Sequence, residues 1–276
     1  MSRAKLLNLN LGKKEILLWI LAFAITIGSA VYQRMTGPTY PSRNKIRVGE
    51  NTISAKLLRS ETTGKDLPIE VKVSDKSISG YVQFQRYKSM DDWKKILMIR
   101  AGDTLTAQLP SQPASGKIMY FVFLQKDNQK ISMSGDKPVV ARYKGAVPAA
   151  VLIPHVLFMF LAMLFSNRAA FEALNQRGKA YQYTLWTIGL FLIGGFIFGP
   201  LVQNYAFGEL WTGIPFGYDL TDNKTLIAML GWILAWIKNR NGKKGRGWII
   251  FAGILMLTVY LIPHSVLGSE LDYTNH

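Results

Sequence analysis

The sequence lacks cysteine altogether, has three histidines in 276 residues and carries far fewer acids than bases. Without cysteine, structural disulfides, thiolate zinc sites, iron–sulfur clusters and covalent CxxCH haem attachment are excluded. The 17 acidic against 33 basic residues leave a formal net charge of +16. With 49% hydrophobic residues, the chain is too apolar for a disordered protein and too charged for one that lies wholly in a membrane. It therefore combines residues suited to lipid with residues suited to water.

Five apolar segments predict membrane-spanning helices, because a bilayer core of about 30 Å needs roughly 20 helical residues. They run from about 16 to 32, 147 to 166, 184 to 202, 221 to 237 and 248 to 268. The fourth is the weakest, since it reaches spanning length only if its helix starts near Thr221. Buried core helices are the alternative, but no soluble layer is left to cover five of them.

The distribution of lysine and arginine predicts the orientation. If the five segments alternate, the basic short loops all fall on one side, which the positive-inside rule identifies as cytoplasmic. The N-terminus is then cytoplasmic, and residues 36–146 and the C-terminus lie outside. The long apolar run of the first segment favours an uncleaved signal-anchor over a cleaved signal peptide. The bases concerned are Arg3, Lys5, Lys13, Lys14, Arg168, Arg177, Lys179, Lys238, Arg240, Lys243, Lys244 and Arg246.

Residues 43–144 differ in pattern from the rest of the chain. Seven or eight short runs alternate between apolar and polar residues and are separated by turn residues, which is typical of an antiparallel β-sandwich of the immunoglobulin or fibronectin-III kind. In 81–87, for example, Val82 and Phe84 point one way while Tyr81, Gln83 and Gln85 point the other. The predicted organisation is a signal-anchor region (1–35), a β-sandwich (36–146) and a four-helix membrane region (147–276) with an outer loop at 203–224.

Two histidines supply the candidate site. His155 and His264 lie within predicted spans, where a polar side chain is costly and suggests a function. Counting 1.5 Å per residue, both lie roughly 5–10 Å below the outer surface. Asp219 and Asp222 of the outer loop can add carboxylates above them. The simpler interpretation is that Asp222, and to a lesser degree Asp219, caps the fourth segment.

The outer loop is long for a connection, and its aromatic content argues against disorder. We expect it to fold back over the histidines, with Tyr205, Trp211, Phe216, Tyr218 and Asn223 covering the site.

Three interpretations of this site remain open. The histidines form a structural or relay cluster, or bind a divalent metal such as zinc or iron, or clamp a b-type haem or a quinone. The glycines Gly194, Gly195 and Gly199 would allow the close approach of a cofactor, although a helix–helix contact is the simpler use of such spacing.

Several strings resemble a family of bacterial multi-pass inner-membrane proteins that has an extracytoplasmic β-sandwich insertion and no assigned activity. The resemblance implies the same architecture, a bacterial inner-membrane location and a periplasmic outer side, and it supplies no reaction. The strings are Gln108–Lys117, Ile153–His155, Tyr205–Thr225 and Tyr260–Tyr273.

The leading functional hypothesis is therefore an inner-membrane protein with a polar His/Asp site beneath its outer face, which binds a metal, a haem or a lipidic ligand. The alternative is a non-catalytic accessory or assembly subunit whose sandwich docks a periplasmic partner. A metal-dependent membrane hydrolase is third, since no nucleophile–base pair is specific enough to favour it. We expect the bilayer and a periplasmic or membrane protein as partners, and no nucleic acid, because no such binding motif is present.

Overall fold

The computed structural model describes residues 3–49, 51–175, 178–240 and 245–263, together with Leu271 and Tyr273; for residues 3–11 only the backbone is described. These residues fall into two compact units. The helical unit holds the described residues of 1–37, 147–204 and 209–268. The β unit holds those of 38–146, 205–208 and 269–276. Each unit is considered by itself.

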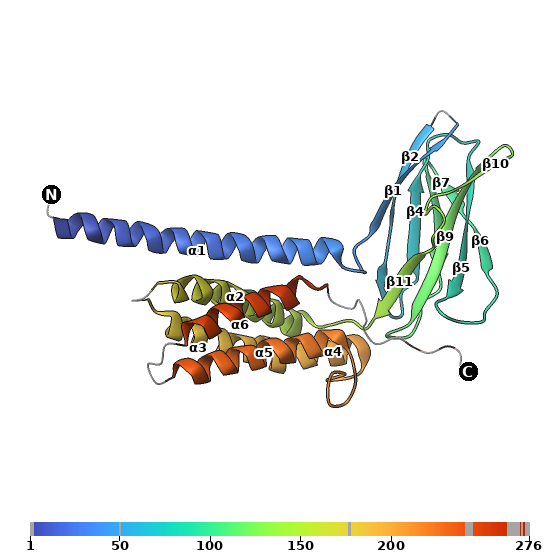
Figure 1. Cartoon of the computed structure of the whole chain (residues 1–276). Helices are drawn as coiled ribbons and strands as arrows, with labels where there is room; N and C mark the ends of the chain where they lie inside the picture. Colours follow the sequence, from blue (N-terminus) through green and yellow to red (C-terminus); the bar gives the residue numbers. More distant parts are fainter. Residues whose placement is uncertain are drawn as a thin grey trace. The chain divides into compact units, whose positions relative to one another are not determined.

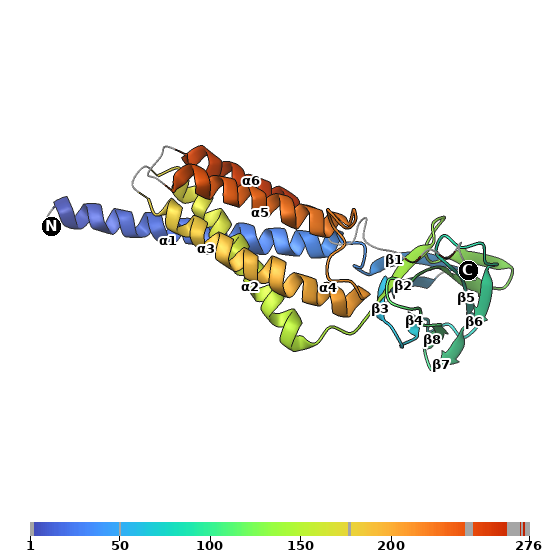
Figure 2. The same ribbon diagram turned by 90° about the horizontal axis from the view of Figure 1, so that it is seen from below.

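The helical unit is built from long helices that pack side by side (Figures 1 and 2). Helix α2 contacts α3 and α6, and α5 contacts the same two helices, so the four enclose one interior. Helix α1 contacts α2 and α6. Helices α3, η1 and α4 follow one another without a break, and η1 is a π-helical stretch. The elements are α1 (Arg3–Thr36), α2 (Ala149–Ala173), α3 (Ala180–Phe191), η1 (Leu192–Phe198), α4 (Gly199–Phe207), α5 (Leu220–Asn239) and α6 (Arg246–Leu261).

Three of these helices are long and apolar enough to cross a membrane, within the part of the chain that the structure describes. They are Gly12–Thr36, Ala149–Ala173 and Ala180–Phe207, with mean hydropathies of 1.9, 2.2 and 2.0. The predicted five-span bundle is therefore wrong. Helix α6 has 16 residues, or about 24 Å at 1.5 Å per residue, which is short of a bilayer core. Helix α5 carries Asp222, Asn223 and Lys224 in its first turns, and these polar residues lower its hydropathy.

Small side chains fill much of the interior of the helical unit. Ala162, Ala228 and Ala252 are completely buried. A Cβ added at Gly253 would lie 2.8 Å from the Cβ of Ala170, so α6 and α2 approach as closely as glycine allows. Large apolar side chains instead cover the outside, and Trp186 is 60% exposed. Small residues inside and large apolar residues outside are typical of helices that pack in lipid.

One charged residue is also completely buried in this unit. Arg168 of α2 forms ion pairs with Glu172 on its own helix and with Glu15 of α1. Its guanidinium lies 5.5 Å from the ring centroid of Trp19 and 4.9 Å from that of Tyr183. Arg168 therefore ties α1, α2 and α3 together with charge that is locally compensated.

The β unit consists of three sheets (Figure 1). One has two strands (β1–β2), one has three (β4–β8–β7), and the largest has the order β3–β11–β9–β5–β6 with β10 also paired to β9. The strands are β1 (Ser42–Val48), β2 (Asn51–Leu57), β3 (Ser60–Thr62), β4 (Leu67–Lys72), β5 (Ser79–Arg86), β6 (Lys94–Leu97), β7 (Ile99–Ala101), β8 (Thr104–Leu109), β9 (Lys117–Lys126), β10 (Gln129–Ser132) and β11 (Val139–Lys144).

The β-rich region after the first helix exists as predicted, but the two-sheet antiparallel sandwich does not. The strands form three sheets, and β3 pairs with β11 in parallel. The alternation in β5 does hold, since Val82 and Phe84 join the buried core. Alternation fixes which face of a strand is buried; it does not fix which strand becomes the neighbour.

Two short segments from outside 38–146 complete the β unit. In the first, the Ala206 carbonyl accepts a hydrogen bond from Gly145 N (2.8 Å), and the Phe207 ring lies 4.2 Å from the Arg142 guanidinium. In the second, Tyr273 is 9% exposed, and its hydroxyl donates to Gln112 Oε1 (3.3 Å). The end of α4 and the residues Leu271 and Tyr273 therefore pack against the β sheets.

Candidate functional site

The structure places His155 against a backbone carbonyl. Its Nδ1 lies 2.9 Å from the carbonyl oxygen of Gly194 in η1, which also accepts from Gly199 N. Because a carbonyl can only accept, Nδ1 carries the proton. The other nitrogen, Nε2, is then the one able to accept a hydrogen bond or bind a metal. The ring also packs beside Gly199, where an added Cβ would lie 3.8 Å from His155 Cε1.

The predicted partner of His155 cannot be placed, because His264 lies outside the described residues. The described residues contain no group of three His, Asp or Glu side chains that could hold a metal ion. The shared histidine site therefore stays a prediction.

The two predicted carboxylates have separate tasks. Asp219 is the N-cap of α5 and accepts a hydrogen bond from Thr221 N (2.7 Å). Asp222 is buried and accepts from both Thr212 N (2.6 Å) and Thr212 Oγ1 (3.2 Å). Asp219 is thus the cap and Asp222 holds the loop, the reverse of the expected preference. The sequence spacing could not decide which of the two residues is the cap, because Asp219 lies just before the first turn of α5 and Asp222 lies within it.

The loop that leads into α5 does fold back on the helices. Asn223 Oδ1 accepts from Ile214 N (2.7 Å), and the Trp211 ring stacks on Phe196 of η1 at 5.7 Å. Phe216 and Tyr218 point the other way, because they are 83% and 91% exposed. Tyr205 belongs to the β unit. Trp211 and Asn223 therefore fix the loop on the helical unit, whereas the other three aromatic residues do not cover a site within it.

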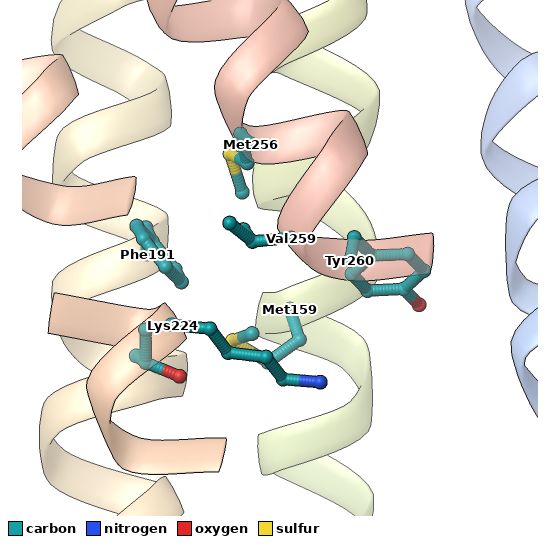
Figure 3. A pocket seen from close by; sticks show the side chains of 7 residues that line it. Met159, Phe191, Lys224, Met256, Val259 and Tyr260 are labelled. Carbon is teal, nitrogen blue, oxygen red and sulfur yellow. The ribbon is translucent and has the colours of Figure 1, made fainter. Parts of the chain in front are cut away.

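Sequence reasoning missed Lys224, which lines a cavity in the helical unit. The cavity measures about 20 Å³, room for a single water molecule. Lys224 is 5% exposed, and its Nζ donates to the carbonyl of Ile262, the C-cap residue of α6. Figure 3 shows its side chain extending past Met159. A cation at a helix C-terminus is favourable, so helix capping accounts for the buried charge.

A second feature lies on one face of the largest sheet of the β unit. Tyr81 pairs with Phe123 across β5 and β9, and Gln83 pairs with Phe121, so these side chains project to the same face. The Tyr81 and Phe123 rings stack at 5.0 Å, Phe123 and Phe121 stack at 5.7 Å, and Trp93 lies 5.5 Å from Phe121. This row of rings stands on the face opposite to the core residues Val82 and Val122.

Two lysines lie over these rings. Lys95 Nζ of β6 is 4.2 Å from the Tyr81 ring centroid, and Lys130 Nζ of β10 is 4.3 Å from that of Phe123 and 5.4 Å from that of Tyr81. Both lysines are exposed. Among the residues that the structure describes, neither ammonium has an ion-pair partner. We call this surface the Lys–aromatic face; it consists of Tyr81, Gln83, Trp93, Lys95, Phe121, Phe123 and Lys130.

One signal for this face was present in the sequence, because the aromatic residue Tyr81 occupied a position expected to face water. What the sequence did not supply was the pairing that sets β5 beside β9 and brings Lys95 and Lys130 over the rings.

Comparison with known proteins assigns no family, since no family model and no curated protein matches the chain. The resemblance to the bacterial membrane family stays a prediction, and the functional argument rests on geometry.

Proposed function

We propose that this protein is a membrane-anchored accessory protein that recognises a partner outside the cytoplasm through the Lys–aromatic face of its β unit. The observation that carries the proposal is the pair of exposed ammonium groups, without carboxylate partners among the described residues, held over a row of aromatic rings. Cations beside aromatic rings favour an anionic partner, and the stacked rings form a surface that is ordered before binding.

The polar residues of the helical unit support this choice over a catalytic one. Arg168, Asp219, Asp222 and Lys224 each satisfy a helix end, a loop or an ion pair within the fold. His155 donates to a carbonyl. These contacts give each of the five residues a role in packing, whereas Lys95 and Lys130 of the β unit have no such role.

We place the protein in a bacterial inner membrane, with its N-terminus in the cytoplasm and the β unit in the periplasm. The segment 205–208 and the residues Leu271 and Tyr273 support this topology, because both belong to the β unit and so lie on its side of the membrane. The chain must then return to that side after α2–α4. A reporter that is active only outside the cytoplasm should work when fused after Lys144 and fail after Lys179. Activity after Lys179 would contradict the proposed topology.

Site-specific photo-cross-linking tests the recognition role. A benzoylphenylalanine at Phe121 of the full-length protein, irradiated in native membranes, should form a discrete adduct. The same group at Gln108, an exposed position on the three-stranded sheet, is the matched control. We expect the Phe121 adduct to disappear in the Lys95→Glu/Lys130→Glu variant. Absence of any adduct specific to Phe121 would reject the proposed function.

A further inference from the structure

We infer that the ligand of the Lys–aromatic face is an acidic saccharide, with its acid group between Lys95 and Lys130 and a sugar ring against Phe121 and Trp93. This inference rests on the proposed function and names the chemical class of the partner.

The two ammonium groups define an anion site. Both lie within 5.4 Å of the Tyr81 ring centroid, so two like charges converge on one ring. Tyr81 itself is 7% exposed and stacks on Phe123, which fixes the position of that ring. Two ammonium groups near the same ring repel each other. A carboxylate between Lys95 and Lys130 would relieve this repulsion.

The neighbouring surface suits a sugar ring. Phe121 and Phe123 are stacked with an angle of 27° between their planes, and Trp93, 40% exposed, continues the row beyond Phe121. A pyranose presents a flat face of C–H groups, which gains dispersion energy against an aromatic ring, and a rim of hydroxyl groups. Gln83 lies in register between Phe121 and Lys95, where its amide can both donate to and accept from hydroxyl groups.

The charge of the face fits this class better than a neutral glycan. The seven residues of the face include two lysines and no acidic residue, so the charge that they carry is positive. The apolar part is formed mainly by flat rings, which match a flat ligand.

The test is calorimetric titration of the full-length protein, in nanodiscs of zwitterionic lipid, with a tetramer of α-1,4-linked galacturonic acid. We expect the acid to bind at least tenfold more tightly than its methyl ester, because the ester keeps the rings and loses the charges. Lys95→Glu/Lys130→Glu should weaken binding of the acid at least tenfold, and Phe121→Ala several-fold. The matched control Lys56→Glu/Lys72→Glu makes the same charge change at exposed positions on the other two sheets and should stay within twofold.

Three outcomes would overturn the inference. They are no binding of the tetramer, equal binding of acid and ester, or equal losses in the Lys95/Lys130 and Lys56/Lys72 variants. Sedimentation with vesicles of anionic phospholipid that depends on Lys95 and Lys130, without tetramer binding, would assign the face to a membrane surface instead. A retained Phe121 cross-link in any of these cases would leave the recognition role standing and reject only the ligand class. Unchanged unfolding midpoints of the variants would show that they remain folded.

Discussion

The helical unit and the β unit differ in the side chains that they bury and expose. The β unit buries large aliphatic side chains such as Leu124 and Ile118 completely, whereas the helical unit buries many alanines beside a few large side chains such as Trp232, and it exposes Ile153 and Trp186. The core of a water-soluble domain gains stability from the apolar area that it removes from water, so it favours large side chains. Helices in lipid gain little from that transfer and depend on close backbone approach. The comparison supports the proposal that the helical unit lies in lipid and the β unit in water.

The units also treat charge differently. The helical unit compensates its buried Arg168 with Glu172 and Glu15 and with two aromatic rings. The β unit leaves Lys95 and Lys130 exposed over its rings. The charge of Arg168 is part of the packing, whereas the charges of Lys95 and Lys130 remain available for a partner.

The largest expected effect comes from breaking the buried charge cluster. Arg168→Leu should destabilise the protein by about 3–5 kcal/mol, because Glu172 would be left buried without its cation. Thermal unfolding of the detergent-solubilised protein measures this loss. Arg240→Leu, at an exposed arginine, should change stability by at most about 0.5 kcal/mol.

A double replacement separates packing from charge at this cluster. Arg168→Leu/Glu172→Leu should lose less stability than Arg168→Leu alone, since no buried carboxylate remains unpaired. If the double variant is the less stable of the two, Glu172 stabilises the unit without Arg168, for example through its hydrogen bond from Lys179 N (3.0 Å), and the proposed reason for the loss is wrong.

The next effect tests the core of the β unit. Leu124→Ala removes a completely buried side chain of β9 and should cost about 2–4 kcal/mol in urea unfolding. Leu97→Ala, on an edge strand where the leucine is 69% exposed, should cost less than about 0.5 kcal/mol. Similar losses at the two positions would contradict the assignment of a water-excluded core.

A smaller effect tests the close approach of η1 to α2 in the helical unit. Gly194→Ala should destabilise the protein by about 1–3 kcal/mol, because the added Cβ would lie 3.0 Å from both Met159 N and Phe158 Cβ of α2. Gly189→Ala is the matched control, since an added Cβ has no neighbour within 4 Å and alanine favours helix. It should leave stability unchanged or raise it slightly. Thermal unfolding distinguishes the two, and equal effects would argue against tight packing at Gly194.

The smallest effect concerns acid stability of the β unit. Arg86 forms two hydrogen bonds with the Asp91 carboxylate and lowers its pKa from 3.8 to about 2. A hydrogen bond from Lys126 and others from Ser77 also lower the pKa of Asp75. Because the folded-state pKa values lie below the unfolded ones, their contribution is full above about pH 4 and is lost as the pH falls toward 2.

Asp91→Asn should therefore flatten the decrease in unfolding midpoint between pH 4 and pH 2 while lowering the midpoint at neutral pH. Asp92→Asn, at the next residue and outside this ion pair, is the control and should leave the pH profile unchanged. A profile of the Asp91 variant that parallels the wild type would show that Arg86 does not stabilise the charged form.

Much of the architecture followed from the sequence by itself. Long apolar runs at about 16–32, 147–166 and 184–202 predicted the apolar helices that the structure shows at 12–36, 149–173 and 180–207, because hydropathy over about 20 residues is a local property. Alternation predicted a β region with Val82 and Phe84 inside, since side chains on a strand alternate by geometry. Even the loop before α5 was expected to fold back.

What the sequence could not decide depended on distant parts of the chain. Only the tertiary structure showed that Asp219 caps α5 while Asp222 holds Thr212, and that the ring of His155 lies against the carbonyl of Gly194. The Lys–aromatic face is assembled from β5, β6, β9 and β10, and no local pattern specifies which strands become neighbours. Local sequence sets the period and the polarity of each element, whereas long-range pairing determines which of the exposed side chains meet.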